Sequence, residues 1–172
     1  MYSCNGKNFN HCAFPVPIPG PQGIQGPPGP VPQSAFKAVT DNQQPYTVPV
    51  TPTPVTYEIR LFDLNDEYDV MTSTFIPKQN GVYFVLASIG FFSEVANKSL
   101  ELAILVNDET TIIDNENFSS FFFSNPVISV SGTLLLNAGD KVTVSHTNSG
   151  IGLILSAFSS THFEATRLPS PL

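Results

Sequence analysis

The 172-residue chain has no tryptophan and only two cysteines, and charged residues make up 12% of it. With so little charge and a net charge of −7, it has no basic surface for nucleic acid or an anionic membrane. No stretch approaches the roughly 18 apolar residues of a membrane span. The segment Met1–Phe14 also lacks the basic and apolar regions of a secretory signal. These absences argue against nucleic-acid binding, membrane insertion and signal-directed secretion.

Catalytic motifs are also missing. The three histidines, His11, His146 and His162, stand outside any nucleophile or metal motif, and there is no Gly-x-Ser-x-Gly segment. His11 beside Cys12 matches no zinc-ligand spacing. We therefore predict a protein that is not an enzyme and that has no cofactor and no metal site.

Residues 1–19 form a leader that ends in Phe14-Pro-Val-Pro-Ile-Pro19. Alternating proline disfavours both helix and central-strand pairing, so we expect this piece to be extended. Phe14, Val16 and Ile18 would then form a row of apolar side chains suited to docking. Cys4 and Cys12 have two interpretations, either exposed reduced thiols or disulfides that link neighbouring subunits under oxidising conditions.

Residues 20–31 have glycine at every third position, Gly20, Gly23, Gly26 and Gly29, with proline between them. A collagen triple helix requires this spacing because only glycine fits at its crowded axis. The alternative is a single-chain polyproline II spacer. Twelve residues reach only about 35 Å, so a triple helix here would need another domain to hold three chains together.

From residue 34 onward the pattern is one of short strands and turns. Ser34–Ala38 begins this part, and residues 45–54 form a proline-rich, edge-like stretch. The almost continuously apolar run 82–92 predicts a strand buried on both faces. We expect an all-β sandwich or jelly roll of about ten strands. The other predicted strands are 55–62, 72–76, 100–106, 110–114, 118–123, 127–136, 141–146 and 152–163.

Six residues fall at the spacings of the complement C1q signature: Tyr57, Asp63, Tyr68, Phe75, Gly81 and Tyr83. On these residues, and on matching text at 35–38, 134–142 and 158–160, residues 34–164 resemble a C1q/TNF-type head. Tyr57 stands where phenylalanine is usual, and Val85 and Ala87 where aromatics are usual. The resemblance implies a ten-stranded jelly roll that forms compact homotrimers, followed here by an extended tail, residues 165–172.

Two local features have alternative interpretations. Asp63, Asp66, Glu67 and Asp69 are typical of a turn, which we favour, although some heads of this family hold calcium near their trimer axis. The run Phe121, Phe122 and Phe123 is expected in the core or the trimer interface. Its alternative is a receptor surface for another chain's leader.

The order of leader, collagen-like stalk and head resembles the collagen-like proteins of bacterial endospores, in the exosporium nap and in endospore appendage fibres. Such proteins are laid on the spore by the mother cell and need no secretion signal, so the resemblance implies a spore-surface location. In that group, leaders of the Phe-x-Pro-x-Pro kind resemble docking peptides. The stalk has no threonine for glycosylation, unlike long nap stalks, which suits a short connector.

The first functional hypothesis is a structural subunit of a spore-surface fibre, in which leaders dock head-to-tail into neighbouring trimers. The alternative is a terminal head that binds a ligand or adheres, anchored to the spore by its leader. The expected partners are other copies of the chain and other spore-surface anchor or tip proteins.

Overall fold

The computed structural model describes residues 20, 34–93, 98–119, 126–157 and 159–169. The chain divides into two units, residues 1–30 and 31–172, and the described fold is that of the second unit. We call this second unit the head. Over the described ranges, no helix has the length and apolar character needed to cross a membrane.

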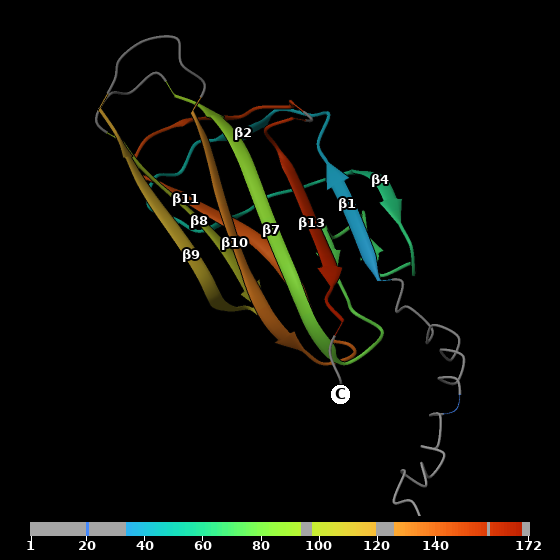
Figure 1. Ribbon diagram of the computed structural model, residues 1–172. Coiled ribbons are helices and arrows are strands. Elements are labelled where there is room, and N and C mark those ends of the chain that lie inside the picture. Colours follow the sequence, from blue (N-terminus) through green and yellow to red (C-terminus); the bar gives the residue numbers. More distant parts are fainter. Residues whose placement is uncertain (1–19, 21–33, 94–97, 120–125, 158, 170–172) are drawn as a thin grey trace, which may run out of the picture. The chain divides into compact units, whose positions relative to one another are not determined.

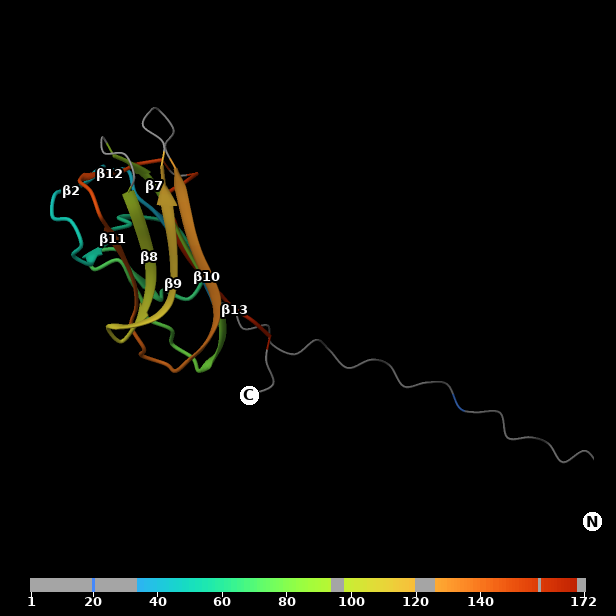
Figure 2. The same ribbon diagram turned by 90° about the vertical axis from the view of Figure 1, so that its left-hand side faces the viewer.

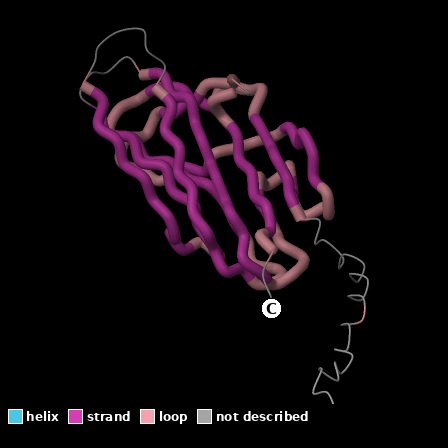
Figure 3. The backbone as a smooth tube through the Cα atoms, in the orientation of Figure 1, coloured by secondary structure: helices cyan, strands magenta, loops and turns pink. Residues whose placement is uncertain are grey.

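The described residues contain thirteen strands and no helix (Figures 1 and 3). The strands are β1 (Ala35–Val39), β2 (Gln44–Tyr46), β3 (Thr53–Pro54), β4 (Ile59–Asp63), β5 (Tyr68–Asp69), β6 (Thr74–Phe75), β7 (Gly81–Phe92), β8 (Lys98–Val106), β9 (Glu109–Phe118), β10 (Val127–Leu136), β11 (Val142–Asn148), β12 (Gly152–Ile154) and β13 (His162–Arg167).

The strands form two antiparallel sheets packed face to face (Figures 1 and 2). The seven-stranded sheet has the order β2-β12-β7-β13-β1-β4, with β10 paired to the other edge of β7. The six-stranded sheet has the order β5-β6-β11-β8-β9, with β3 paired to β11. The predicted all-β jelly-roll sandwich is confirmed.

The core lies between the two sheets, and every second residue of each strand points into it. On β7 the inward residues are all fully buried, and so are three on the facing strand β8. They are Tyr83, Val85, Ala87, Ile89 and Phe91 on β7, and Leu100, Leu102 and Ile104 on β8.

The outward side of β7 differs between its two halves. Residues 88–91 are buried on both faces, as predicted, but Val82, Phe84 and Leu86 are only half-buried. The prediction that the whole run 82–92 is buried on both faces is therefore wrong for its first half. Apolar side chains are left at the surface of the seven-stranded sheet there.

The predicted last strand, 152–163, is wrong, because the chain leaves the sheet between β12 and β13 and both strands pair with β7. The buried Thr161 hydroxyl fills the gap in the ladder. It accepts from the Gly90 amide at 3.0 Å and donates to the Leu155 carbonyl at 2.7 Å. The side chain thus supplies the hydrogen bonds that a continuous strand would have made.

Three other predicted boundaries differ from the structure. One strand, β9, runs through residues 115–117, between the separate predicted strands 110–114 and 118–123, because this edge strand keeps its pairing with β8. Residues 55–58 lie outside any strand, so the predicted strand 55–62 begins late, at Ile59. Strand β13 continues to Arg167, so residues 165–167 pair in the sheet and do not belong to an extended tail.

The two ends of the head carry different loops. The chain enters β1 and leaves β13 at one end, where the Arg167 amide donates to the Ser34 carbonyl at 2.9 Å. We call this the proximal end, at the bottom of Figure 1. The opposite, distal end holds the loops 47–52 and 149–151, joined by a 2.8 Å bond from the Val50 amide to the Asn148 carbonyl.

His146 on β11 is a buried titratable residue near the distal end. It is 2% exposed, its Nδ1 atom has no hydrogen-bond partner, and its ring meets that of Tyr46 edge-on at 4.7 Å. Burial lowers the pKa of His146 from 6.5 to about 4. The fold therefore holds this imidazole in its neutral form at neutral pH.

Acid should destabilise the head through this residue. The unfolded chain binds the proton more readily, so stability falls as the pH drops from about 6.5 to about 4, by roughly 3 kcal/mol in total. We expect the His146→Phe variant, which keeps an aromatic ring against Tyr46, to lose less stability over this range. Urea unfolding from pH 7 to pH 4 measures the difference. Parallel curves for the two proteins would contradict the assignment.

Candidate functional site

The outer face of the seven-stranded sheet is the first candidate site. The strand registers align Leu86 of β7, Glu164 of β13, Lys37 of β1 and Phe62 of β4 in one row across four strands. Two apolar side chains thus flank an ion pair, in which Lys37 Nζ lies 2.7 Å from a Glu164 carboxylate oxygen. Phe62 is 46% exposed.

Two further rows continue this face toward the proximal end. Phe84 pairs with Thr133 of β10 and Thr166 of β13, and Val82 pairs with Leu135 of β10. Leu135, near the end of β10, is 71% exposed and adds a large apolar side chain to this surface. We call the outward residues Phe62, Val82, Phe84, Leu86 and Leu135 the apolar face.

A hollow of about 280 Å³ lies within the apolar face, between Phe62 and Phe84. Ala35, Glu164 and Thr166 line it together with the two rings. The rings, the hollow and the single ion pair make a surface that can receive apolar side chains. It offers no nucleophile beside a general base.

Strands β9 and β10 run side by side at one edge of the head (Figure 2). A second hollow, of about 440 Å³, lies at this edge. The Ile112 side chain packs against the Gly132 backbone, so the two strands are in contact further along. The hollow is lined by Val106, Thr111, Leu134 and Leu136, together with polar residues of the adjoining turn. We call it the edge groove.

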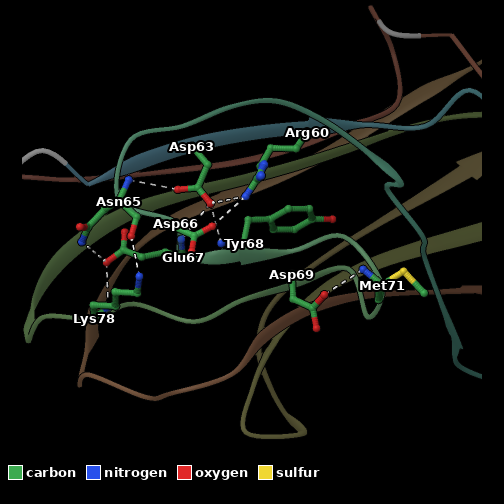
Figure 4. Close-up of polar contacts among 9 residues, drawn as sticks. All are labelled: Arg60, Asp63, Asn65, Asp66, Glu67, Tyr68, Asp69, Met71 and Lys78. Carbon is green, nitrogen blue, oxygen red and sulfur yellow. Dashed lines mark hydrogen bonds and ion pairs between the residues drawn. The ribbon is translucent and has the colours of Figure 1, made fainter.

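The acidic segment after β4 is a hydrogen-bonded turn (Figure 4). One Asp63 carboxylate oxygen accepts from the amides of Glu67 and Tyr68, both at 2.8 Å, and the other accepts from the Asn65 amide at 3.3 Å. The guanidinium of Arg60 lies 3.5 Å from the same carboxylate. Asp63 therefore fixes the loop backbone.

Glu67 has a similar role one turn further on. Its side chain is buried and accepts from the Ser34 hydroxyl, the Asn65 side-chain amide at 3.0 Å and the Lys78 backbone amide at 2.7 Å. This carboxylate joins the start of β1 to the turn before β7. Glu67 thus links three proximal segments through one carboxylate.

The other two acidic side chains of this segment also have ion-pair or hydrogen-bond partners. Asp66 pairs with Arg60 at 3.0 Å, and Asp69 accepts from the Met71 amide at 2.9 Å and the Thr72 hydroxyl at 2.8 Å. The Thr72 and Met71 hydrogen bonds lower the pKa of Asp69. In the described ranges, no three histidine, cysteine or acidic side chains are grouped to hold a metal ion. This geometry favours a turn over a calcium site.

The aromatic residues of the C1q signature are core residues. Tyr68 and Phe75 both stack on Phe36, at 4.6 and 4.8 Å between ring centroids, and the Tyr68 hydroxyl donates to the Tyr57 carbonyl at 2.8 Å. The Tyr83 hydroxyl donates to the Gln79 carbonyl at 2.9 Å. A side chain at Gly81 would collide with that of Arg167. The signature therefore specifies the fold and does not mark a binding site.

The two described histidines are placed differently. His146 is buried in the core under Tyr46, where a substrate cannot reach it. His162 lies on β13, and burial, with Lys37 nearby, lowers its pKa. Other predicted site residues fall outside the described ranges: Cys4, Cys12, Phe14, Val16, Ile18, Gly23, Gly26, Gly29 and Phe121–Phe123. Gly20 is described and exposed.

The residues of the apolar face were not predicted as a site. A signal was present, because β7 is apolar at nearly every position, whereas a strand with one wet face alternates. Which strands lie beside β7, and so which residues complete the face, depends on pairings such as β7 with β10 and β13 that join distant parts of the chain.

No protein-family model and no curated protein matches the chain. Solved structures do match it. Eiger TNF from S. frugiperda has 16% identity and a TM-score of 0.59, with 81% of this chain and 94% of its own covered. Murine APRIL at pH 5.0 has 15% identity and a TM-score of 0.57, with 78% and 98% covered. The globular domain of zebrafish complement 1qA protein has 21% identity and a TM-score of 0.49, with 81% and 100% covered. The first two likenesses establish the fold, a jelly roll of the C1q/TNF type.

Removing the Asp63 carboxylate should destabilise the head. We expect Asp63→Ala to cost about 3 kcal/mol, because hydrogen bonds to a charged acceptor are lost and loop amides are left unpaired. Asp41→Ala, at an exposed position, should cost less than about 0.5 kcal/mol. Chemical unfolding of both variants at pH 7 measures the costs. Equal small effects would show that this turn does not depend on Asp63.

Proposed function

We propose that the protein is a structural subunit of a fibre on the surface of a bacterial endospore. Three heads associate through the apolar face, the collagen-like segments of the three chains run together, and the leaders dock on a neighbouring trimer. The observation that carries the proposal is the apolar face. The order of leader, stalk and head, and its resemblance to spore collagen-like proteins, support the location.

The apolar face is larger than an isolated jelly roll needs. It exposes Phe62 and Leu135 beside the half-buried Phe84 and Leu86, on a sheet whose other side already forms the core. Burying a large apolar side chain contributes about 1.5–3 kcal/mol. Contiguous apolar surface of this kind marks an interaction site. Self-association gives these side chains a partner in every copy of the chain.

A closed ring of three requires two different contact surfaces on each copy. Contact of the apolar face with itself would produce a twofold dimer, whereas contact with a different surface closes into a ring of three when each copy is rotated by a third of a turn from the last. The edge groove, lined by Val106 and Leu134, is such a second surface, and Leu135 lies where the two meet. Packing the edge of one head on the apolar face of the next builds the trimer.

Three associated heads would also explain a stalk of only four triplets. Glycines 20, 23, 26 and 29 suit a triple helix, but so short a segment needs its chains gathered at a high effective concentration. The heads supply that concentration because each stalk continues directly into β1. Three leaders per trimer then dock together, and Cys4 or Cys12 could cross-link the joint where conditions are oxidising.

Placing a charge on the apolar face should separate the heads. We expect Phe84→Asp to shift full-length protein from trimers to monomers, because the carboxylate would lose its water in the contact. Light scattering coupled to size exclusion measures the mass. Met71→Asp, at an 88% exposed position in the turn between β5 and β6, is the matched control and should stay trimeric. A trimeric Phe84→Asp protein would contradict the proposed interface.

Deleting the leader should abolish polymerisation but not trimers. We expect full-length protein to form filaments and protein lacking residues 1–19 to remain as separate trimers, since the docking segment is gone. Negative-stain microscopy of both preparations distinguishes the outcomes. Filaments of the truncated protein would refute leader docking. Separate full-length trimers at high concentration would favour the terminal-head alternative.

A further inference from the structure

We infer that the distal end of the head receives the leader segment 14–19 of another trimer. The receiving surface consists of the loops 47–52 and 149–151, which we call the distal surface. This inference rests on the proposed function, because it names where the docking takes place. It is carried by the distribution of charge over the head, by the side chains that the loops expose, and by the direction of the chain.

Charge is absent from the segments that build the distal surface. Residues 42–57 and 142–163 contain no aspartate, glutamate, lysine or arginine. Far apart in the sequence, they meet through the pairing of β2 with β12 and of β3 with β11. Asp41 and Glu58 border the first segment, and the Glu58 carboxylate accepts a hydrogen bond from the Thr40 hydroxyl at 2.7 Å.

The proximal end has the opposite character. Its loops 64–67, 77–80, 107–108 and 137–141 are joined by hydrogen bonds, such as those from Gly139 to Pro77 and from Asn107 to Lys141. Each of these loops carries at least one charged residue. They are Asp66, Glu67, Lys78, Asp108, Asp140 and Lys141. The loops at the proximal end are therefore charged, whereas the distal loops 47–52 and 149–151 are not, and the charged residues nearest to them are Asp41, Glu58 and Lys98.

The distal loops expose large apolar side chains. Val48 is 57% exposed, Val50 is 73% exposed and Ile151 is 49% exposed. The pairing of Tyr46 with Gly152 places the loops next to one another. Val50 also has a φ of 60°, which a β-branched residue rarely adopts and which costs free energy. The exposed side chain of Val50 therefore does not add to the stability of its own head.

Hydrogen bonds hold the backbone of the distal surface in place. The carbonyl of the buried Asn148 accepts from the Val50 amide at 2.8 Å and from the Tyr46 hydroxyl at 3.0 Å. The Asn148 side chain accepts from the Gly150 amide at 2.9 Å. Ser149 is bonded to Ser99 of β8 in both directions. A pre-organised surface loses little conformational entropy on binding.

The leader has the matching chemistry. Residues 8–36 contain no charged side chain, and Phe14, Val16 and Ile18 alternate with Pro15, Pro17 and Pro19. Contact of this segment with the charged proximal loops would remove water from charged side chains, whereas the distal loops 47–52 and 149–151 carry no charge that would lose water. The prolines fix φ along the segment, which lowers the entropy cost of docking.

The direction of the chain also favours the distal end as the docking site. The leader leads, through the stalk, into β1 at the proximal end, and β7 separates this end from the distal loops by about 40 Å. A contact from the leader of one trimer to the distal end of the next adds each subunit in the same sense. Such a heterologous contact does not close, so it propagates as a filament.

The test places two carboxylates on the distal surface of the full-length protein. We expect the Val48→Asp/Val50→Asp double variant to stay trimeric but to need at least about tenfold more protein to form filaments, because its loops no longer accept an apolar segment. Ile151→Asp, in the other loop, provides a second variant should the first fold poorly. Met71→Asp, at an exposed position in the turn between β5 and β6, is the control and should assemble like the unmodified protein.

Mixing the double variant with unmodified protein shows whether the distal surface or the leader is defective. The double variant keeps its leader, so small amounts should bind to unmodified filaments and shorten them by blocking further growth. Filaments of unchanged length and unchanged critical concentration in the distal variants would overturn this inference while leaving leader docking intact. Failure of the unmodified protein to form filaments would instead remove the proposed function.

Discussion

The structure depends on one strand with two apolar sides. The inward residues of β7 close the core against the six-stranded sheet, while Val82, Phe84 and Leu86 leave its other side without cover. A strand with one face on the core and the other in water would carry polar residues on the water-facing side. The uncovered side gains stability only when another apolar surface is placed on it. In the proposed function, self-association of the head, the register of three stalks and the multivalency of three leaders rest on this constraint.

A second constraint is the uneven distribution of charge along the head. Carboxylates at the proximal end serve the fold, because Asp63 and Glu67 satisfy backbone amides of loops that would otherwise lack partners. The distal loops are held instead by the backbone and side chain of the uncharged Asn148. The same fold thus has charged loops at the end where β1 begins and uncharged, apolar loops 47–52 and 149–151 at the opposite end. A head with two such different ends suits directional assembly.

Much of the fold can be read from the sequence. The uninterrupted strand 127–136 and the turn at residues 137–141 were predictable from local pattern, because turns and apolar runs are local signals. A hairpin between strands 127–136 and 141–146 was also predicted and is wrong, because β10 pairs with β7 and β11 pairs with β8 of the other sheet. The break between β12 and β13 was not, since the Thr161 hydroxyl replaces ladder bonds only once β7 lies beside it. The C1q signature identified the fold, yet its residues are core and turn residues. Phe62, Phe84 and Leu135 form a face only through pairings between distant strands, so that face could not be assembled from local pattern.

The account stands or falls on the number of chains in the smallest stable particle. Sedimentation equilibrium of the full-length protein, in dilute reducing buffer where filaments do not persist, measures that number directly. A particle three times the 18.6 kDa mass of one chain is the predicted result. A species of a single chain mass would contradict it, because the apolar face would then be exposed to water in the functional protein.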